Sequence, residues 1–200
     1  MKLPEVIKKL SGSLSELPSI GPRQAIRLAF YLAARGAESN KNLAESIREL
    51  GNAKICERCF FIHQNRENLC DICKDASRKQ SAIMVVEKET DLISLEDTGR
   101  FNGRYLILGA IPKTGLLEGW QKLRLQNLKS FIEKELGGKA EEVILAFNPT
   151  SYGDFHASII TKEIGSLAKK VSRLGIGIPT GGEIEFADSD TLGNALQKRS

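Results

Sequence analysis

The sequence predicts a mixed α/β protein with a helical N-terminal region, a four-cysteine module and an α/β domain with a mostly parallel sheet. Three observations lead to this fold class. Apolar residues recur at helical spacing through residues 1–54, all four cysteines lie within residues 55–75, and short apolar runs alternate with helical patterns from residue 81 onward. The chain is 41% hydrophobic, which is typical of a globular protein.

The N-terminal region, residues 1–54, is expected to form three helices. The first carries apolar residues at i, i+3 and i+4, which predicts a buried face formed by Leu3, Val6, Ile7, Leu10 and Leu14. The second should begin at Pro22, because proline suits the first helical position, and end before Gly36. The third covers about residues 40–50, with one face formed by Leu43, Ile47 and Leu50.

The segment between the first two helices, residues 17–23, has the form of a helix-hairpin-helix DNA-binding turn. A tight turn with a glycine leaves backbone N–H groups unpaired at the positive N-terminus of the next helix, where a phosphate can accept hydrogen bonds. We expect Ile20 and Gly21 to form this phosphate contact. The usual hairpin has two glycines, and Ser19 stands at the first of them. The alternative is a plain corner between two helices.

Basic residues accompany this turn. Arg23 and Arg27 are four residues apart, so they share a helix face and are expected to clamp phosphates without reading bases. Residues 1–80 carry 14 Lys and Arg against 9 Asp and Glu, whereas residues 81–200 carry 15 against 16. The excess of positive charge therefore lies in the N-terminal part. This distribution fits a surface that faces nucleic acid, and ordinary solvated lysines are the alternative.

The chain is expected to be soluble and cytosolic. No apolar run approaches the length of about eighteen residues that indicates a membrane span. Residues 1–10 contain a proline and two adjacent lysines and lack the apolar core of a signal peptide. A reducing compartment would keep thiols free.

The four cysteines predict a structural zinc site. They form the pattern C-x2-C-x10-C-x2-C within eighteen residues, at Cys56, Cys59, Cys70 and Cys73. Two such knuckles supply four thiolates, and structural zinc takes four tetrahedral ligands with no open position. A pair of disulfides would need an oxidising compartment, and a thioredoxin-like redox motif would need a single C-x-x-C. His63 is expected to be a surface or loop histidine outside the ligand set.

The region from residue 81 onward alternates strands and helices. Strands are expected at 82–86, 105–108 and 143–147, with a short fourth at 175–178. Helices are expected at about 89–95, at 123–136 before two glycines, and as a long helix within 155–174. This order predicts a mostly parallel sheet. The polar segment 74–80 before it is expected to be an exposed joint.

Acidic residues follow two of these strands. Ligands gather at the carboxyl ends of strands in such sheets. Glu87 follows the first strand, and Asp154 ends the segment 148–154 after the third. Carboxylates on neighbouring strand ends can hold Mg²⁺ against phosphates. Solvated loop acids, or a capping group for the following helix, are the alternatives.

The three segments in this order resemble the bacterial recombination mediator family RecR, over essentially the whole chain. The resemblance rests on residues 17–32, the four cysteines, and the stretches 84–110, 143–154 and 181–196. It implies a Toprim domain at 81–176, the module shared with topoisomerases and DnaG-type primases. It also implies a Walker B-like assembly segment at 177–200. Proteins of this family form ring-shaped tetramers, described as clamps, that act with RecO and RecF in loading RecA on gapped DNA coated with single-strand-binding protein.

The chain departs from this pattern in its acids. Catalytic Toprim domains have an Asp-x-Asp pair where this chain has Asn148, Pro149 and Thr150. RecR proteins commonly have an acid at the position of Tyr152 and a Glu at that of Asp154. No G-x-x-x-x-G-K-[ST] motif occurs, so no ATPase is implied.

We therefore expect a DNA-binding mediator without catalysis, assembled from dimers into tetramers through residues near 17–32 and 181–196. By resemblance, it would work in the bacterial cytoplasm at the nucleoid. Glu87 and Asp154 would form a docking surface for a basic partner, RecO. The alternative is a Toprim phosphoryl-transfer enzyme, nuclease or primase-like, that uses Glu87 and Mg²⁺.

Overall fold

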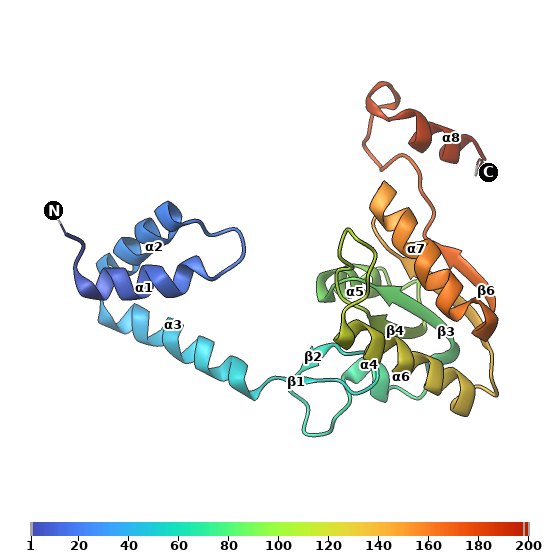
Figure 1. Cartoon of the computed structure of the whole chain (residues 1–200), viewed down its shortest axis with the longest axis horizontal. Coiled ribbons are helices and arrows are strands. Elements are labelled where there is room, and N and C mark those ends of the chain that lie inside the picture. The colour runs from blue at the N-terminus through green and yellow to red at the C-terminus, as the bar shows by residue number, and fades with distance from the viewer. Residues whose placement is uncertain (1, 198, 200) are drawn as a thin grey trace. The chain divides into compact units, whose positions relative to one another are not determined.

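The computed structural model describes residues 2–197 and 199, and the chain divides into two units, Met1–Ala53 and Lys54–Ser200 (Figure 1). No helix in the described part of the chain has the length and apolar character needed to cross a membrane.

The N-terminal unit contains three helices, α1 (Glu5–Ser15), α2 (Pro22–Ala34) and α3 (Ala37–Glu49), followed by the 3-10 turn Leu50–Asn52. The predicted bounds of α2 are confirmed, with Pro22 at its first position. Helix α3 begins three residues earlier than expected. Gly36 separates it from α2 in a left-handed conformation, φ 87°, that favours glycine.

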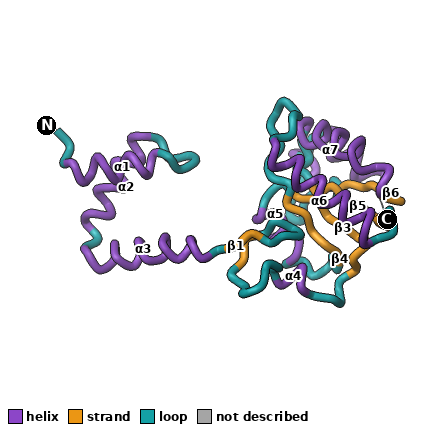
Figure 2. Tube along the Cα trace, turned by 60° about the horizontal axis from the view of Figure 1, so that its bottom comes forward, coloured by secondary structure: helices purple, strands orange, loops and turns teal. Residues whose placement is uncertain are grey.

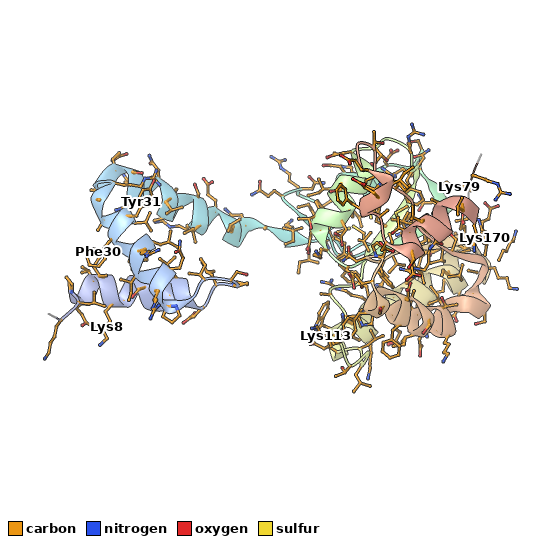
Figure 3. All side chains as sticks on the ribbon, turned by 90° about the horizontal axis from the view of Figure 1, so that it is seen from above. Lys8, Phe30, Tyr31, Lys79, Lys113 and Lys170 are labelled. Carbon is orange, nitrogen blue, oxygen red and sulfur yellow. The ribbon has the colours of Figure 1, made fainter. Side chains whose placement is uncertain are left out.

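This unit buries little of its apolar surface. Ile7, Ala25 and Ala29 are buried, but Val6 on the predicted face of α1 is 74% exposed. The predicted apolar face of α3 is exposed along its whole length, and Phe30 and Tyr31 on α2 are also exposed (Figure 3). A unit of about fifty residues cannot bury every apolar side chain. The spacing of apolar residues in the sequence therefore predicts where the apolar faces lie, but not whether they are buried.

The C-terminal unit is built on a four-stranded parallel sheet, which confirms the predicted α/β fold. Its strands are β3 (Lys79–Val86), β4 (Gly103–Ile107), β5 (Ala140–Ala146) and β6 (Ala168–Arg173), in the order β4-β3-β5-β6 (Figure 2). Crossover helices connect them: α5 (Glu89–Glu96), α6 (Gly119–Glu135) and α7 (Ser151–Ile164). Strands β3 and β5 lie in the centre of the sheet, and β4 and β6 form its edges.

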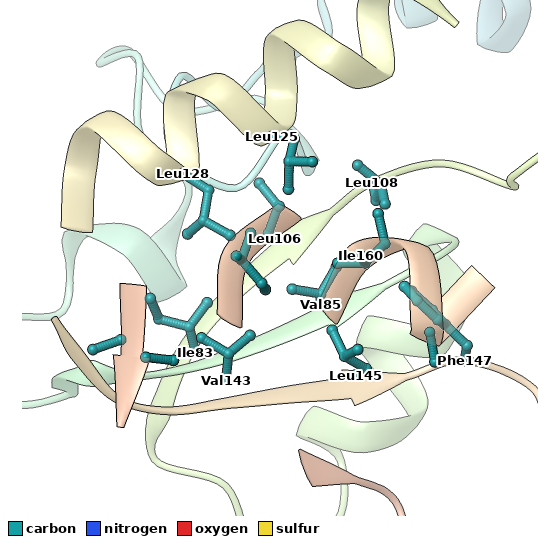
Figure 4. Packing of buried hydrophobic residues seen from close by; sticks show 14 of the residues in the cluster. Ile83, Val85, Leu106, Leu108, Leu125, Leu128, Val143, Leu145, Phe147 and Ile160 are labelled. Atoms are coloured by element: carbon teal, nitrogen blue, oxygen red, sulfur yellow. The ribbon is translucent and has the colours of Figure 1, made fainter. Parts of the chain in front are cut away.

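The sheet has a different covering on each face. Side chains alternate along β3, so Ile83 and Val85 pack with residues of α6 and α7, including Leu125 and Ile160 (Figure 4). Met84 and Val86 point to the opposite face. There they pack with Leu92 of α5, Tyr105 and the four cysteines. The cysteine module is therefore part of the core of this unit.

Two predictions of secondary structure within this unit were wrong. The fourth strand is Ala168–Arg173, rather than 175–178, and it lies where a long helix was expected. Helix α7 ends at Ile164 because a 3-10 turn, Gly165–Leu167, separates it from the strand. The edge strand exposes two lysines and has no strict alternation, so its pattern could also be read as the end of a helix.

The predicted exposed joint at 74–80 is exposed at residues 74–77 and 79, but not at Arg78. Arg78 is buried, and its guanidinium makes two hydrogen bonds to the carboxylate of Glu96, with Nη2 to Oε2 at 2.8 Å. Its Nε also donates to the carbonyl of Gly103 at 2.8 Å. Strand β3 begins directly after it, so these bonds fix the start of β3 against α5 and β4.

The chain continues beyond β6 into a 3-10 turn, Ile184–Phe186, and helix α8 (Ser189–Gln197). No residue of α8 is buried. Ile184, Phe186 and Leu196 are also largely exposed, with Phe186 at 80%. This segment thus presents apolar side chains that its own unit does not cover.

Candidate nucleic-acid interface, metal centre and strand-end acids

The turn between α1 and α2 exposes the N-terminus of α2. Ser19 has a left-handed conformation, φ 65°, in the turn where the hairpin pattern has its first glycine. Ile20 N–H donates to the carbonyl of Leu17 at 3.2 Å, which closes the turn. Gly21 caps α2 with an ordinary extended conformation, and a Cβ added there would meet no atom within 4 Å. The space beside the backbone of Gly21 is therefore open to a ligand.

The first turn of α2 offers donors for an anion. Pro22 has no N–H and Ala25 N–H donates to the carbonyl of Gly21, but the N–H groups of Arg23 and Gln24 have no intrahelical acceptor, and no side chain caps them. Arg23 and Arg27 are exposed, and within the described chain neither forms an ion pair with a carboxylate. The arrangement combines free backbone donors, a positive helix end and two exposed cations, which is the chemistry of phosphate binding.

The four cysteines converge on one point. Cys56 and Cys59 lie in the turn between β1 (Lys54–Ile55) and β2 (Ile62–His63). Cys70 is the N-cap of the short helix α4 (Asp71–Lys74), and Cys73 lies within that helix. All four are buried, and their Sγ atoms lie within 4.8 Å of one another. Cys56 N–H donates to Phe61 O at 2.9 Å and Phe60 N–H to Cys56 O at 3.0 Å, which shapes the first knuckle.

This geometry fits a tetrahedral metal ion. Four sulfurs held about 2.3 Å from a zinc ion lie about 3.8 Å apart. Cys59 and Cys70 have their sulfurs 3.4 Å apart, and all four cysteines are free thiols rather than disulfides. A hydrogen bond from Cys59 holds the pKa of the Cys56 thiol well below its ordinary value. The cluster could bind a metal ion with no position left open, so such an ion would have a structural role.

His63 is buried in β2, which corrects the expectation of a surface or loop histidine. Its Nδ1 accepts a hydrogen bond from the backbone N–H of Asn65 at 3.2 Å. It is not part of the four-sulfur cluster.

The cysteine module caps the edge strand β4. Ile107 N–H donates to the carbonyl of Cys59 at 2.9 Å, and Arg124 of α6 donates to the carbonyl of Ile107 at 3.0 Å. The guanidinium of Arg124 also lies over the ring of Phe60. These contacts pair backbone groups that would otherwise form an open sheet edge.

Two arginines near the sulfurs have no counterpart in the sequence prediction. Arg104 on β4 is buried and lies 3.7 Å over the ring of Phe131, with no hydrogen-bond partner for Nη1. Burial lowers the pKa of this guanidinium, and the sulfur of Cys73 beside it acts in the opposite direction. Arg58 is exposed and directs Nη1 to the carbonyl of Cys73 at 3.4 Å. Neither residue fits a metal-ligand or phosphate-binding motif, so sequence patterns gave no signal for them.

Glu87 lies at the carboxyl end of β3, in a cavity of about 460 Å³. Its side chain is 11% exposed and faces His156 of α7, with Oε1 3.8 Å from Nδ1. Asn148 Nδ2 donates to the other carboxylate oxygen at 3.2 Å. The cap of α5 is Lys88, whose N–H donates to Asp91 at 3.1 Å, so Glu87 is not the capping group.

His156 was missed by the sequence prediction. It is buried, and its Nε2 donates to the carbonyl of Pro112 at 3.1 Å, since a carbonyl can only accept. The position is one helical turn inside α7, and a lone histidine there has no motif that would identify it.

Asp154 is engaged separately from Glu87. It forms an ion pair with Arg173 at the end of β6, and its side chain is 62% exposed. Tyr152 lies under the amino group of Lys113, 5.4 Å from the ring centre. In the described residues, the cysteine cluster is the only group of three or more potential metal ligands of the Cys, His, Asp and Glu types. The strand-end acids therefore form separate pairs with a histidine and an arginine.

Comparison with known proteins gives matches to three stretches of the chain. Family models match a RecR helix-hairpin-helix region at residues 7–50, a Toprim domain at 81–175 and a RecR C-terminal region at 177–200. Recombination protein RecR of Herpetosiphon aurantiacus is 41% identical over 199 residues, covering 98% of this chain and 94% of that protein. Recombination protein RecR of Rubrobacter xylanophilus is 38% identical, covering 96% of this chain and 95% of that protein. At this identity and coverage, the chain belongs to the RecR family of recombination proteins.

Proposed function

We propose that this protein is a DNA-binding recombination mediator in DNA repair that works as a ring-shaped clamp without catalysis. With RecO and RecF, it would help RecA replace single-strand-binding protein on gapped DNA in the bacterial cytoplasm, at the nucleoid. The observation that carries this proposal is the open N-terminus of α2, where free N–H groups lie beside Arg23 and Arg27. Family membership supports the role in recombination.

DNA binding is tested by its salt dependence. Arg23→Ala and Arg27→Ala should weaken binding about equally for all sequences and reduce the log–log salt slope by roughly one unit each. Arg48→Ala is the matched control, because Arg48 lies on α3 and pairs with Glu45 at 2.7 Å. Unchanged affinity at low salt for both Arg23→Ala and Arg27→Ala would place the DNA contact elsewhere.

We propose that the cysteine cluster binds one zinc ion per subunit through Cys56, Cys59, Cys70 and Cys73. The mutual distances of the sulfurs and their burial support this assignment. Zinc bound there would cross-link the two knuckles, and its stabilisation would be part of folding. Metal analysis of the purified protein should find about one zinc per chain. Intact disulfides and no metal would refute the assignment.

Assembly into dimers and then a tetrameric ring is the third part of the proposal. Its support is unburied apolar surface in both units. A groove of about 340 Å³ lies among α1, α2 and α3, and Ile184, Phe186 and Leu196 are exposed near the C-terminus. Several copies would multiply the weak hold of a single hairpin on DNA. The solution mass with and without DNA tests this, and a monomer at all concentrations that still binds DNA tightly would contradict it.

The strand-end acids are proposed to dock a basic partner, RecO, rather than to catalyse. Phosphoryl transfer on DNA normally relies on Mg²⁺ held by several carboxylates. Here Glu87 faces His156 and Asn148, and Asp154 pairs with Arg173. Glu87→Ala and Asp154→Asn should weaken the RecO complex and preserve zinc content and DNA affinity. Mg²⁺-dependent cleavage or priming by the pure protein, lost in Glu87→Ala, would instead establish the enzyme.

A further inference from the structure

Arg104 is a buried cation without an anionic partner in the described chain. Its side chain belongs to β4, a strand of the Toprim sheet, and the residue is 6% exposed. Nη1 has no hydrogen-bond partner, and no carboxylate forms an ion pair with this guanidinium among the described residues. The ring of Phe131 contacts one face of the group. An aromatic ring compensates only part of the cost of burying a full charge.

The ring of Phe131, which covers the guanidinium of Arg104, also lines a cavity together with the ligand residue Cys73. The thiol of Cys73 opposes the fall in the pKa of Arg104, as a neighbouring negative charge would. Arg58, from the first knuckle, lines the same small cavity as Arg104 and reaches the carbonyl of Cys73. The two arginines would repel each other if nothing anionic lay beside them. Thiols that keep their protons in the metal-free cluster carry no charge and do not remove this repulsion.

A metal ion changes the charge of the cluster. Binding requires the thiolate form, so four cysteines contribute four negative charges and a divalent ion returns two positive ones. The loaded centre thus carries a net charge of about −2, buried against the sheet. We propose that Arg104 is the buried counter-cation of this centre, with Arg58 as a second, solvent-side cation. This inference rests on the proposed zinc site. It means that a side chain of strand β4 contributes to the affinity of that site for metal.

The proposal makes metal loading and the sheet edge interdependent. Arg104 and Ile107 lie on the same strand, and Ile107 N–H donates to the carbonyl of the ligand residue Cys59. A loaded centre attracts β4 through Arg104 and holds it through this backbone bond. Groups that hydrogen-bond or neutralise ligands in this way commonly change metal affinity by about 10- to 100-fold when removed.

Zinc affinity of the full-length protein, measured by competition with a chromophoric chelator, tests the assignment. Arg104→Met should raise the zinc Kd about 10- to 100-fold. Arg104→Lys, which keeps the charge, should restore part of the loss, and the exposed Arg58→Met should have a smaller effect in the same direction. Arg35→Met is the matched control, because Arg35 also lies over an aromatic ring, that of Tyr31, but belongs to the N-terminal unit. It should leave the zinc Kd unchanged.

A second measurement separates charge balance from simple packing. With zinc bound, Arg104→Met should lower the thermal midpoint relative to the native protein. After zinc removal the sign should reverse, because the substitution then eliminates a buried charge that has no partner. A packing role alone would destabilise both forms equally, and that outcome would overturn the proposal.

Different results would refute the zinc site and the role of Arg104 as its counter-cation. If the native protein takes up neither zinc nor cobalt through its four thiols, the metal site itself is wrong. If the native protein loads zinc tightly and Arg104→Met loads it with the same Kd and no sign reversal, the metal site stands and the counter-cation assignment is wrong. Should Arg104→Met fail to fold, equal zinc affinity of Arg58→Met and Arg104→Lys with the native protein would be the contradicting result.

Discussion

Ile83 and Val85 on β3 are almost completely buried between the sheet and its helices, whereas Ile47 and Leu50 in the N-terminal unit are 60% and 69% exposed. The first two were expected in a buried strand because they belong to a short apolar run, and the last two on one face of a helix because of their spacing. The larger unit closes both faces of its sheet, one with α6 and α7 and the other with α5 and the cysteine module. The smaller unit leaves its faces open. Apolar side chains are therefore buried in the core of the larger unit and left exposed in the smaller one.

Metal removal should have the largest effect and should act on only one unit. Structural zinc contributes an apparent binding free energy of about 10 kcal/mol or more at neutral pH. Chelation, or Cys73→Ser, should strongly destabilise the C-terminal unit and leave the helices of the N-terminal unit folded. Hydrogen exchange is a sharp readout, because the Ile107 amide loses its acceptor on Cys59. Protection of that amide in metal-free protein would contradict this account.

Glu96→Gln should destabilise the C-terminal unit by about 2 kcal/mol near pH 7, since it breaks the charged pair with Arg78. The hydrogen bonds from Arg78 lower the pKa of Glu96. The pair therefore stabilises above the unfolded pKa, about 4.3, and its contribution is lost as pH falls through the lower folded value. Denaturant unfolding of both proteins should converge once the pH lies below the lowered pKa of Glu96 in the folded state. Glu163→Gln, which breaks an exposed pair with Lys129, is the control.

Ser19→Gly should stabilise the N-terminal unit by about 1 kcal/mol, because a non-glycine residue in the left-handed region carries a cost of about that size. Thermal melting followed by helical circular dichroism would show a higher midpoint for this unit. The substitution leaves Arg23 and the α2 N-terminus in place, so DNA affinity should not fall. A lower midpoint would mean that the Ser19 side chain itself supports the turn.

Ile47→Glu should change the unfolding free energy of an isolated subunit by less than about 0.5 kcal/mol, because this side chain is already exposed. It should nevertheless reduce the assembled mass in light scattering, since a charge on the open α3 face opposes burial against another copy. Glu45→Gln on the polar side of the helix is the control. An unchanged mass for Ile47→Glu would exclude this face from the interface.

Much of the fold could be predicted, because buried strands and paired cysteines have strong local patterns. The order of strand and helix and the bounds of α2 followed from such patterns. The edge strand β6 could not be recognised, since its exposed lysines lack strict alternation. Within the site, the cysteines are brought together as their spacing predicts. His156, Arg173 and Arg104 could not be predicted, because each acts on a residue distant in sequence and belongs to no local motif.

The central claim is that the N-terminus of α2 contacts DNA phosphates, and Gly21→Ala tests it most directly. A Cβ at Gly21 meets no protein atom and φ is −77°, so folding should be unaffected. The added methyl group would occupy the space through which a phosphate approaches the backbone. Gly12→Ala, an exposed glycine within α1 that also has open space, is the matched control. We predict that Gly21→Ala weakens DNA binding about 10-fold or more, roughly 1.4 kcal/mol, at an unchanged melting temperature, while Gly12→Ala binds normally. Native affinity in Gly21→Ala would contradict the account.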